Sequence, residues 1–281
     1  MKPALAGRLQ EMGEVLLHLR FPFVFVLSPI FVWGALGAAA GWTGRTTLGF
    51  LLVHLALYPG ANAFNTAYDR DTGPIGGLAR PPSVPVGLAR GSTVLQAAGA
   101  TLAPLIGWVF AAAYVALWGI FTAYSHPRTR WKRLPWLSTP AIVGGQGGLG
   151  WLLGWTAAGG GWPLAGDAVW SLVAASAAVA ALYPFTQIYQ LEADAARRDR
   201  TLAAALGIRG TLAWGGGCFL VVALCGRALG MPVVASYAVL VAAVALAAAA
   251  VAGRTAPSHG MVMRVAYANS ALLLAFMAAA W

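Results

Sequence analysis

The feature that most constrains this chain is its succession of long apolar runs. An α-helix needs about 20 apolar residues to cross the hydrocarbon core of a bilayer. Charged residues make up only 9% of the sequence, against about 25% in a typical soluble domain, and the mean hydropathy is +0.72. The windows that qualify as spans are 21–41, 47–68, 93–109, 110–125, 138–158, 168–190, 207–229, 232–252 and 263–281. The sequence therefore predicts an all-α, polytopic membrane protein with nine transmembrane helices in a bundle.

Two boundaries of this bundle need separate arguments. The uncharged run 92–125 is too long for one span, and we divide it around Val109. In the segment before the first span, apolar residues recur at helical spacing: Leu5, Leu9, Met12, Leu16 and Leu19. Glu11 and Glu14 interrupt that segment, so it is unlike a cleavable signal peptide. We expect an amphipathic surface helix over 1–20, followed by a single intramembrane domain over 21–281.

The distribution of positive charge tests the number of spans. With the N-terminus in the cytoplasm, nine spans leave five segments on the cytoplasmic side. All of the 18 Lys and Arg residues except Arg45 and Arg227 fall in those segments or at their edges, as the positive-inside rule expects. The sequence therefore predicts a cytoplasmic N-terminus and an external C-terminus. It also assigns the net charge of +10 to topology and to contacts with phosphates or membrane lipids, with no nucleic-acid partner.

Acidic residues are scarce, and most of them gather in two loops. Of the eight Asp and Glu residues, those that follow the second or the sixth expected span are Asp69, Asp71, Glu192, Asp194 and Asp199. A carboxylate at the edge of a lipid-facing segment is costly unless something offsets it. The two loops are four spans apart. We interpret the motifs at 62–82 and 187–207 as a pseudo-repeat, in which each half offers a helix end that carries carboxylates.

Each of these helix ends also carries a polar stripe. Residues spaced three or four apart share one face of a helix. On the second span the stripe consists of His54, Tyr58, Asn62, Asn65 and Asp69. On the sixth span it consists of Tyr183, Gln187, Gln190 and Asp194. Because polar side chains within a span normally face the bundle interior, the stripes predict a polar mouth on the cytoplasmic side, above an apolar central cavity.

Carboxylates that converge at such a mouth suit a hard cation. Mg²⁺ prefers oxygen ligands and is usually shared between a few carboxylates and substrate phosphates. Basic residues are near in the sequence, with Arg80 after the first acidic cluster and Arg130, Lys132 and Arg133 in an intervening loop. The acids would hold the metal, the metal and the basic groups a diphosphate, and the apolar cavity a hydrocarbon tail. The sequence therefore predicts a Mg²⁺ cofactor and an isoprenyl diphosphate substrate.

Simpler interpretations stay open for several of these residues. Acidic residues at helix ends are often only solvated, and a single DxD pair has little specificity by itself. The glycines within 73–77 are explained by tight turns more readily than by phosphate binding. Tyr58 and Tyr183 could be packing residues with satisfied hydroxyls. His54 is interpreted as a buried polar contact and not a metal ligand, because no second histidine accompanies it.

The first acidic loop resembles a motif of the UbiA superfamily of intramembrane prenyltransferases. That motif reads NDxxDxxxD, followed by an Arg-Pro pair. The residues that match it are Asn65, Asp69, Arg80 and Pro81. Its second and last acids are replaced here by Thr66 and Gly73, and Asp71 is shifted two positions from the latter. The resemblance therefore leaves open which carboxylate completes the metal site.

Two further segments extend the resemblance over the whole chain. The middle loop of the family, YSxPPxRxKR, is similar to the segment YSHPRTRWKR at 124–133. The second acidic motif, DxExD followed by TL and LG, is similar to QLEADAARRDRTLAAALG, which begins at Gln190. Glu192 and Asp194 match that motif, Gln190 replaces its leading Asp, and Asp199 is additional.

The resemblance implies a nine-helix protein whose two aspartate-rich loops bind Mg²⁺ and an isoprenyl diphosphate. The candidate metal ligands are Asn65, Asp69, Asp71, Gln190, Glu192, Asp194 and Asp199. The candidate substrate contacts are Arg80, Arg130, Lys132, Arg133, His54, Asn62 and Gln187. The candidate catalytic residues are Asn65, Asp69, Asp71 and Asp194, with Tyr58 and Tyr183 as aromatic faces near an allylic cation.

The expected reaction is ionisation of the isoprenyl diphosphate and transfer of the prenyl group to a lipophilic acceptor. One alternative is a UbiA-type terpene cyclase, in which a double bond of the prenyl chain captures the cation. Another is a non-enzymatic transporter, but a transporter coupled to ions would place ionisable groups near the membrane midplane. No Asp, Glu, Lys or Arg falls at the centre of an expected span. The polar groups of His54, Asn62 and Gln187 favour a separate acceptor over cyclisation.

Overall fold

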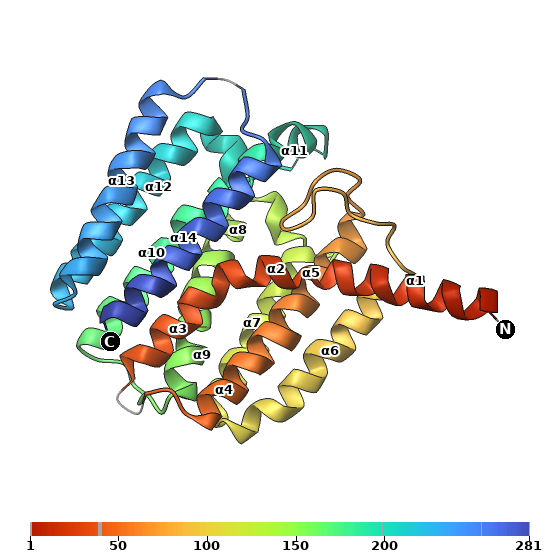
Figure 1. The fold of residues 1–281 in the computed structure, drawn as a ribbon, viewed down its shortest axis with the longest axis horizontal. Helices are drawn as coiled ribbons and strands as arrows, with labels where there is room; N and C mark the ends of the chain where they lie inside the picture. Colours follow the sequence, from red (N-terminus) through yellow and green to blue (C-terminus); the bar gives the residue numbers. More distant parts are fainter. Residues whose placement is uncertain (1, 39–40, 198, 254, 281) are drawn as a thin grey trace.

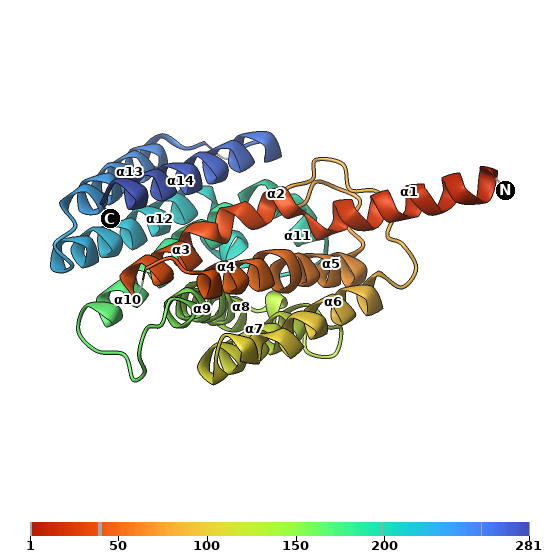
Figure 2. The ribbon, with the colours of Figure 1, turned by 60° about the horizontal axis from the view of Figure 1, so that its bottom comes forward.

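A computed structural model describes residues 2–38, 41–197, 199–253 and 255–280, with side chains from residue 11 to residue 278 of those ranges. Within them the secondary structure is helical, apart from one isolated bridge between Ile75 and Leu78. The prediction of an all-α fold is therefore confirmed (Figures 1 and 2). Arg198 and Arg254, which belong to the expected cytoplasmic charges, lie outside the described residues, as do positions 39–40 and 281 of two expected spans.

In the described ranges the helices follow one another without an intervening sheet. The α-helices are α1 (Lys2–Leu19), α2 (Phe21–Val24), α3 (Ser28–Gly37), α4 (Gly44–Leu51), α5 (Tyr58–Asp69), α6 (Leu88–Leu102), α7 (Trp108–Ser125), α8 (Pro135–Ile142), α9 (Gly150–Ala157), α10 (Asp167–Phe185), α11 (Leu191–Arg197), α12 (Leu202–Ala228), α13 (Pro232–Val251) and α14 (His259–Ala280). Short 3₁₀ segments are η1 (Phe25–Leu27), η3 (Ala103–Leu105), η4 (Trp131–Arg133) and η6 (Ile188–Gln190), and π-helical segments are η2 (Leu52–Leu57) and η5 (Val143–Leu149).

Several of these pieces join end to end into membrane-length rods. In the described part of the chain, seven stretches are long and apolar enough to cross a membrane: Glu11–Gly37, Gly44–Asp69, Trp108–Ser125, Asp167–Arg197, Leu202–Ala228, Pro232–Val251 and His259–Ala278. The windows 93–109 and 138–158 are helical, but they are not among the seven. The first has a short α-helix that ends before Pro104, and the second contains six glycines and Gln146. An integral membrane protein is thus supported, whereas the count of nine spans is not confirmed.

The break in the long uncharged run lies slightly earlier than expected. The helix beginning at Leu88 stops in η3, and α7 starts at Trp108, so the turn is at 106–107 and not around Val109. Gly107 has a φ of 145°, a backbone conformation that residues with a Cβ rarely adopt. Pro104, inside η3, cannot donate the backbone hydrogen bond that would continue the helix.

Helices α3 and α9 form the seam between two hydrophobic clusters. One cluster joins Trp33 and Trp151 to residues of α10, α12, α13 and α14. The other joins Phe31 and Leu153 to residues of η2 and α7. At the crossing of α3 and α9 the two backbones nearly touch. A Cβ on Gly154 would lie 1.9 Å from the Phe31 carbonyl oxygen, so the close approach requires a residue without a side chain.

Helix α1 leaves the bundle as a separate arm (Figures 1 and 2). It ends where Arg20 adopts a left-handed conformation with a φ of 53°, and α2 then continues into the first rod. On the described part of α1, Met12, Leu16 and Leu17 are exposed. Exposed apolar residues on a projecting helix fit the expected location at a membrane surface, and the boundary at residue 20 stays a prediction.

The C-terminal helix gives a direct test of the expected topology. In Figure 1, α14 runs from the neighbourhood of α11 to the opposite end of the bundle. We expect a C-terminal fusion to a periplasmic-type reporter, active only outside the cytoplasm, to be active, and a cytoplasm-dependent reporter at the same position to be silent. The reverse pattern would contradict the topology that the positive-inside rule predicts.

Candidate active site

The loop after α5 is docked onto the other half of the protein, and this docking positions Asp71. The Gln190 side-chain amide donates to the Pro74 carbonyl oxygen at 3.0 Å. The His259 imidazole Nε2 lies 2.8 Å from the Ile75 carbonyl oxygen. These two contacts join the loop to η6 and to the first turn of α14. The first acidic cluster is therefore brought to the second by contacts across more than 100 residues of sequence.

The second acidic cluster is held by its own loop. Helix α10 ends at Phe185, and the chain turns through η6 into the short helix α11. The Thr201 hydroxyl donates to Asp194 Oδ2 at 3.1 Å and also caps the first turn of α12. The Asp199 backbone N–H donates to the Asp194 carbonyl oxygen at 2.9 Å. The carboxylates of both residues are almost completely buried.

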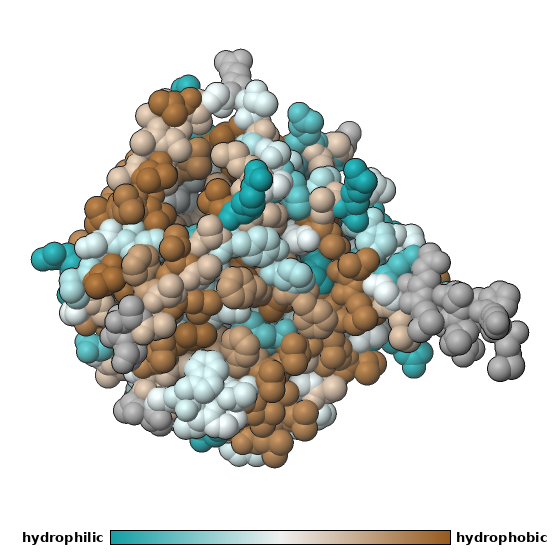
Figure 3. Space-filling view, viewed as in Figure 1, coloured by the Kyte–Doolittle hydropathy of each residue, from teal (hydrophilic) through white to brown (hydrophobic). Residues whose placement is uncertain are grey.

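Both clusters line one cavity of about 230 Å³. The expected site residues that line it are Tyr58, Asn62, Asn65, Asp69, Asp71, Lys132, Tyr183, Gln187, Gln190, Asp194 and Asp199. Its apolar lining includes Ile30, Phe121, Ile142, Val179, Leu182 and Leu273. In Figure 3 hydrophobic residues predominate over the helical bundle, while hydrophilic ones gather toward α11 and the loop after α5. The cavity thus combines a charged end with a chamber suited to hydrocarbon.

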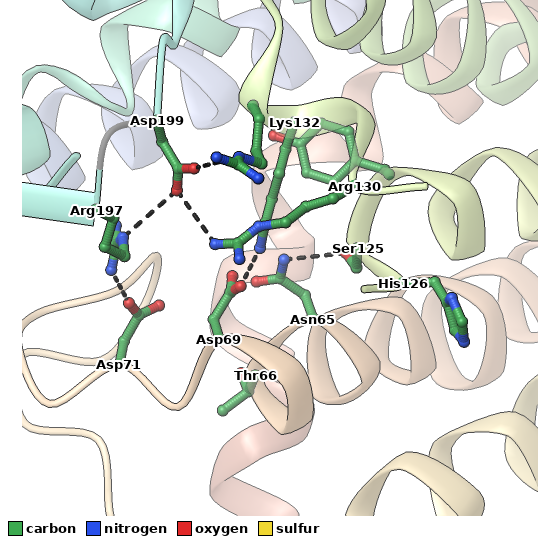
Figure 4. A network of polar contacts seen from close by, with 12 residues as sticks. Asn65, Thr66, Asp69, Asp71, Ser125, His126, Arg130, Lys132, Arg197 and Asp199 are labelled. Atoms are coloured by element: carbon green, nitrogen blue, oxygen red, sulfur yellow. Dashed lines mark hydrogen bonds and ion pairs between the residues drawn. The ribbon is translucent and has the colours of Figure 1, made fainter. Parts of the chain in front are cut away.

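The acids at the charged end are paired with basic side chains from the loop after α7 (Figure 4). The Lys132 ammonium forms an ion pair with Asp69, and both side chains are mostly buried. Arg130 Nη2 lies 3.4 Å from Asp199 Oδ2, and Arg133 Nε lies 3.6 Å from Asp199 Oδ1. Partial burial makes these pairs stronger than pairs on an open surface. Three of the four basic residues expected to bind substrate are therefore at the acids.

Arg197 links the two acidic clusters. Its guanidinium forms ion pairs with Asp71 from the first loop and with Asp194 from the second, the latter at 2.9 Å. Its Nε lies 3.6 Å from Asp199 Oδ2. The sequence interpretation counted Arg197 only as a topology charge. Its spacing of three residues from Asp194 on one helix was a signal for this contact.

The side chains next to Asp69 show which positions can offer a metal ligand. Asn65 Nδ2 donates to the Ser125 hydroxyl at 3.0 Å, so its amide oxygen turns toward Asp69 (Figure 4). The Thr66 hydroxyl donates to the Asn62 carbonyl oxygen at 3.0 Å and is turned away from the acids. Thr66 therefore does not take over the role of the acid that the family motif has at its position.

Burial and the neighbouring cation act in opposite directions on Asp71. Burial raises the pKa of this carboxyl above its ordinary value, because the charged form loses hydration. The guanidinium of Arg197 lowers the pKa and partly offsets that effect, whereas the negative charge of Asp69 raises it further. Arg197 therefore favours the charged form of Asp71, against the effect of burial.

Three expected site residues neither line the cavity nor pair with the acids that line it. Arg80 and Glu192 are exposed, and neither has an ion pair within the described ranges. His54 stacks on Phe50 with ring centroids 3.9 Å apart, and its Nδ1 lies 3.0 Å from the Phe50 carbonyl oxygen. The π-helical segment η2 changes the angle per residue, so His54 leaves the face that Tyr58 begins. Roles for these three residues stay predictions.

The structure also places residues at the cavity that the sequence interpretation did not select. Arg20 is buried beside the charged end and donates to the carbonyl oxygens of Asn62, at 2.8 Å, and Gly76, at 3.4 Å. The Tyr124 hydroxyl lies 3.2 Å from that of Tyr183. The sequence gives only a weak signal for a role of Arg20 at the site. Many single Arg residues between an amphipathic helix and an apolar span only mark the membrane boundary.

The donor set of the site fits Mg²⁺. Carboxylate and amide oxygens are ligands that this hard cation prefers, and it usually keeps waters or substrate oxygens as well. Within the described ranges, no three His, Cys, Asp or Glu side chains already form a coordinating group. The carboxylates are turned instead toward Lys132 and Arg197. A metal would therefore be held by part of the acidic set together with oxygens from a substrate.

Comparison with known proteins decides the family. The sequence matches the UbiA prenyltransferase family over residues 26–277, which is most of the chain. The chain belongs to this family. No curated protein matches it in sequence. The family confirms the resemblance inferred from the loop motifs and supports an intramembrane prenyltransferase as the general class of this UbiA member.

Solved structures agree on the fold. A UbiA homolog from Archaeoglobus fulgidus bound to GPP and Mg²⁺ has a TM-score of 0.72 and 18% identity, over 95% of this chain and 99% of that one. The same homolog bound to DMAPP and Mg²⁺ has a TM-score of 0.71 and 19% identity, over 95% and 98%. A digeranylgeranylglyceryl phosphate synthase has a TM-score of 0.65 and 16% identity, over 96% and 99%. At these identities the likeness extends to the helical fold alone.

Proposed function

We propose that this protein is a Mg²⁺-dependent prenyltransferase that ionises an isoprenyl diphosphate and transfers the prenyl group to a lipophilic acceptor. The observation that carries the proposal is the convergence of two acidic clusters and their basic partners on one end of a largely apolar cavity. The Archaeoglobus homolog with this fold binds GPP or DMAPP together with Mg²⁺, which supports the same ligand classes here. The mouth of the cavity would face the cytoplasm, in keeping with the positive-inside rule.

The charged end would bind the diphosphate and stabilise its departure. Asn65 and Asp69 would supply oxygens for Mg²⁺, which as a Lewis acid would polarise the phosphate oxygens. Lys132 and Arg130 carry positive charge within reach of the same space. When the bond between the prenyl carbon and the diphosphate oxygen breaks, the electron pair leaves with the diphosphate. Lys132 and Arg130 would then stabilise the negative charge that develops on the diphosphate.

The apolar part of the cavity would protect the allylic cation. Ile142, Leu182 and Leu273 exclude water that would otherwise capture it. Tyr58, Phe121 and Tyr183 also line the cavity, and an aromatic face stabilises a nearby cation through its quadrupole. The ring centroids of Tyr58 and Phe121 are 5.9 Å apart, so both faces belong to one wall.

A polar group within the chamber favours a separate acceptor. Gln187 lines the cavity, and its buried side-chain oxygen has no hydrogen-bond partner among the described residues. An unsatisfied buried acceptor is costly, and a hydroxyl from a second substrate would satisfy it. The acceptor then forms a bond to the prenyl carbon with its own electron pair and loses a proton. Of the three groups expected to orient an acceptor, Asn62 and Gln187 line this cavity.

Product analysis tests the proposal. Purified, delipidated protein is incubated with Mg²⁺ and GPP or longer prenyl diphosphates, with and without a membrane lipid extract. We expect diphosphate release with prenol as the product when the extract is absent, and a prenylated lipid when it is present. A cyclic hydrocarbon or cyclic alcohol as the main product without extract would establish a terpene cyclase instead. No diphosphate release under either condition would contradict an enzymatic function.

A further inference from the structure

The guanidinium of Arg197 places a positive charge between the two acidic clusters, as a metal ion bound there would. It contacts carboxylates from both loops, and all three of its nitrogens have an acidic partner: Asp71, Asp194 and Asp199. These acids have side chains no more than 12% exposed, whereas that of Arg197 is 33% exposed and lines the cavity. The cation is therefore held by buried anions while part of it remains accessible to a ligand in the cavity.

The basic residues are divided unequally between the acids. Among the residues that the structure describes, Asp69 has a single ion-pair partner, the primary ammonium of Lys132. Asp199 alone contacts three guanidinium groups, those of Arg130, Arg133 and Arg197. A lysine is a compact charge on a flexible stem, which can leave one acceptor for another. An arginine fork holds several oxygens at once and cannot lose its proton.

Because of this division, the two acidic clusters differ in how readily they can bind a metal ion. At Asp69 an incoming Mg²⁺ needs to displace only one ammonium, and the amide oxygen of Asn65 faces the same space. At Asp194 and Asp199 it would have to displace a guanidinium that also satisfies Asp71. Even with a metal at Asp194 and Asp199, displacing that guanidinium would leave the buried Asp71 carboxylate without its ion-pair partner, which is strongly unfavourable.

We propose that Arg197 serves as a built-in cation at the second acidic cluster, so that the protein binds a single divalent metal, at Asn65 and Asp69. The inference rests on the proposed function, because the accessible part of the guanidinium would contact the diphosphate from the side opposite the metal. Asp71, Asp194 and Asp199 then act as positioning residues that hold Arg197, and they are not metal ligands. A guanidinium suits this place because its fork binds phosphate oxygens two at a time.

Metal stoichiometry tests the inference without relying on turnover. Mn²⁺, which replaces Mg²⁺ and gives an electron paramagnetic resonance signal, is titrated into the purified protein with equimolar geranyl thiolodiphosphate, whose carbon–sulfur bond resists cleavage. We expect one bound Mn²⁺ per complex and no coupling between metal ions. In Arg197→Gln we expect two bound ions with a coupled spectrum, because the three acids have lost their shared cation. Arg200→Gln is the matched control, since Arg200 is exposed and without an acidic partner in the described ranges, and it should bind one.

The outcomes separate this inference from the proposed function. Two coupled Mn²⁺ ions in the unmodified protein would overturn the single-metal inference while leaving prenyl diphosphate binding intact. A count of one in Arg197→Gln would also overturn it, because the acids would then have no affinity for a second ion. The unmodified count decides the question even where Arg197→Gln fails to fold. Failure of the unmodified protein to bind the thiolodiphosphate at all would contradict the proposed function itself.

Discussion

Replacing Asp69 with Asn is expected to lower the rate of diphosphate release by about 100-fold or more, with the protein still folded in the membrane. Asp69 ends α5, lines the cavity and pairs with Lys132. The amide keeps the shape of the side chain but removes the negative charge that would hold Mg²⁺. Loss of one preorganised electrostatic group at a reacting centre commonly reduces kcat by about 100- to 1000-fold. Release of inorganic diphosphate at saturating prenyl diphosphate and limiting Mg²⁺ is the measurement.

Two companion variants make this result specific. Asp194→Asn should cause a similar loss, because its carboxylate is buried between Arg197 and Thr201. Asp167→Asn is the control, since Asp167 is an exposed acid at the start of α10 and does not line the cavity. Turnover close to normal in Asp69→Asn at limiting Mg²⁺ would refute the assignment. An equal loss in Asp167→Asn would point to a general effect of charge removal.

Sequence periodicity predicted the parts of the site that lie on regular structure. Tyr58, Asn62, Asn65 and Asp69 belong to one helical face, and the structure places all four at the cavity. His54 fails to join them because η2 is π-helical. A π-turn inside an α-helix has no reliable signature in a single sequence. The sequence therefore could not show that residues before Tyr58 lie on a different face of the helix.

Pairing between charges of different loops could not be predicted from the sequence. It supplied the acids and the bases, but it did not determine which cation meets which carboxylate. The partners Asp71 and Arg197 are 126 positions apart, and they meet because the loop after α5 is docked on η6 and α14. That docking uses backbone carbonyl oxygens of Pro74 and Ile75, which every residue type possesses. The contact therefore left no recognisable pattern of side chains.

The membrane spans illustrate a different limit. Composition identified the apolar rods, and charge distribution gave an internally consistent count of nine. The windows 93–109 and 138–158 nevertheless fall short of the length or hydropathy of a typical span, although both are helical in the structure. Glycine lowers the hydropathy of a segment, and it also permits the close helix contacts seen at Gly154. A glycine that allows two helices to pack closely therefore also makes its segment harder to recognise as a span from hydropathy.

Replacing Lys132 with Met is expected to weaken binding of a prenyl thiolodiphosphate by about 10- to 100-fold and to lower kcat/KM for the diphosphate to a similar degree. A hydrogen bond to a charged group contributes about 1.5–3 kcal/mol, which corresponds to that range. The methionine preserves the length and the packing of the buried side chain while removing its charge. The ammonium now on Asp69 would move to the phosphate oxygens when the metal takes the carboxylate. Calorimetric titration of the thiolodiphosphate measures the loss.

The same variant should bind Mn²⁺ more tightly when no diphosphate is present, and this opposite change identifies the mechanism. In the unmodified protein the ammonium competes with the metal for Asp69, so metal alone has to break an ion pair. Without Lys132 this competition is absent, and any cation that binds the buried Asp69 carboxylate stabilises it. Arg128→Met, at an exposed position of the same loop, should change neither affinity. Weaker binding of both Mn²⁺ and the thiolodiphosphate in Lys132→Met would mean that Lys132 only maintains the structure of the loop.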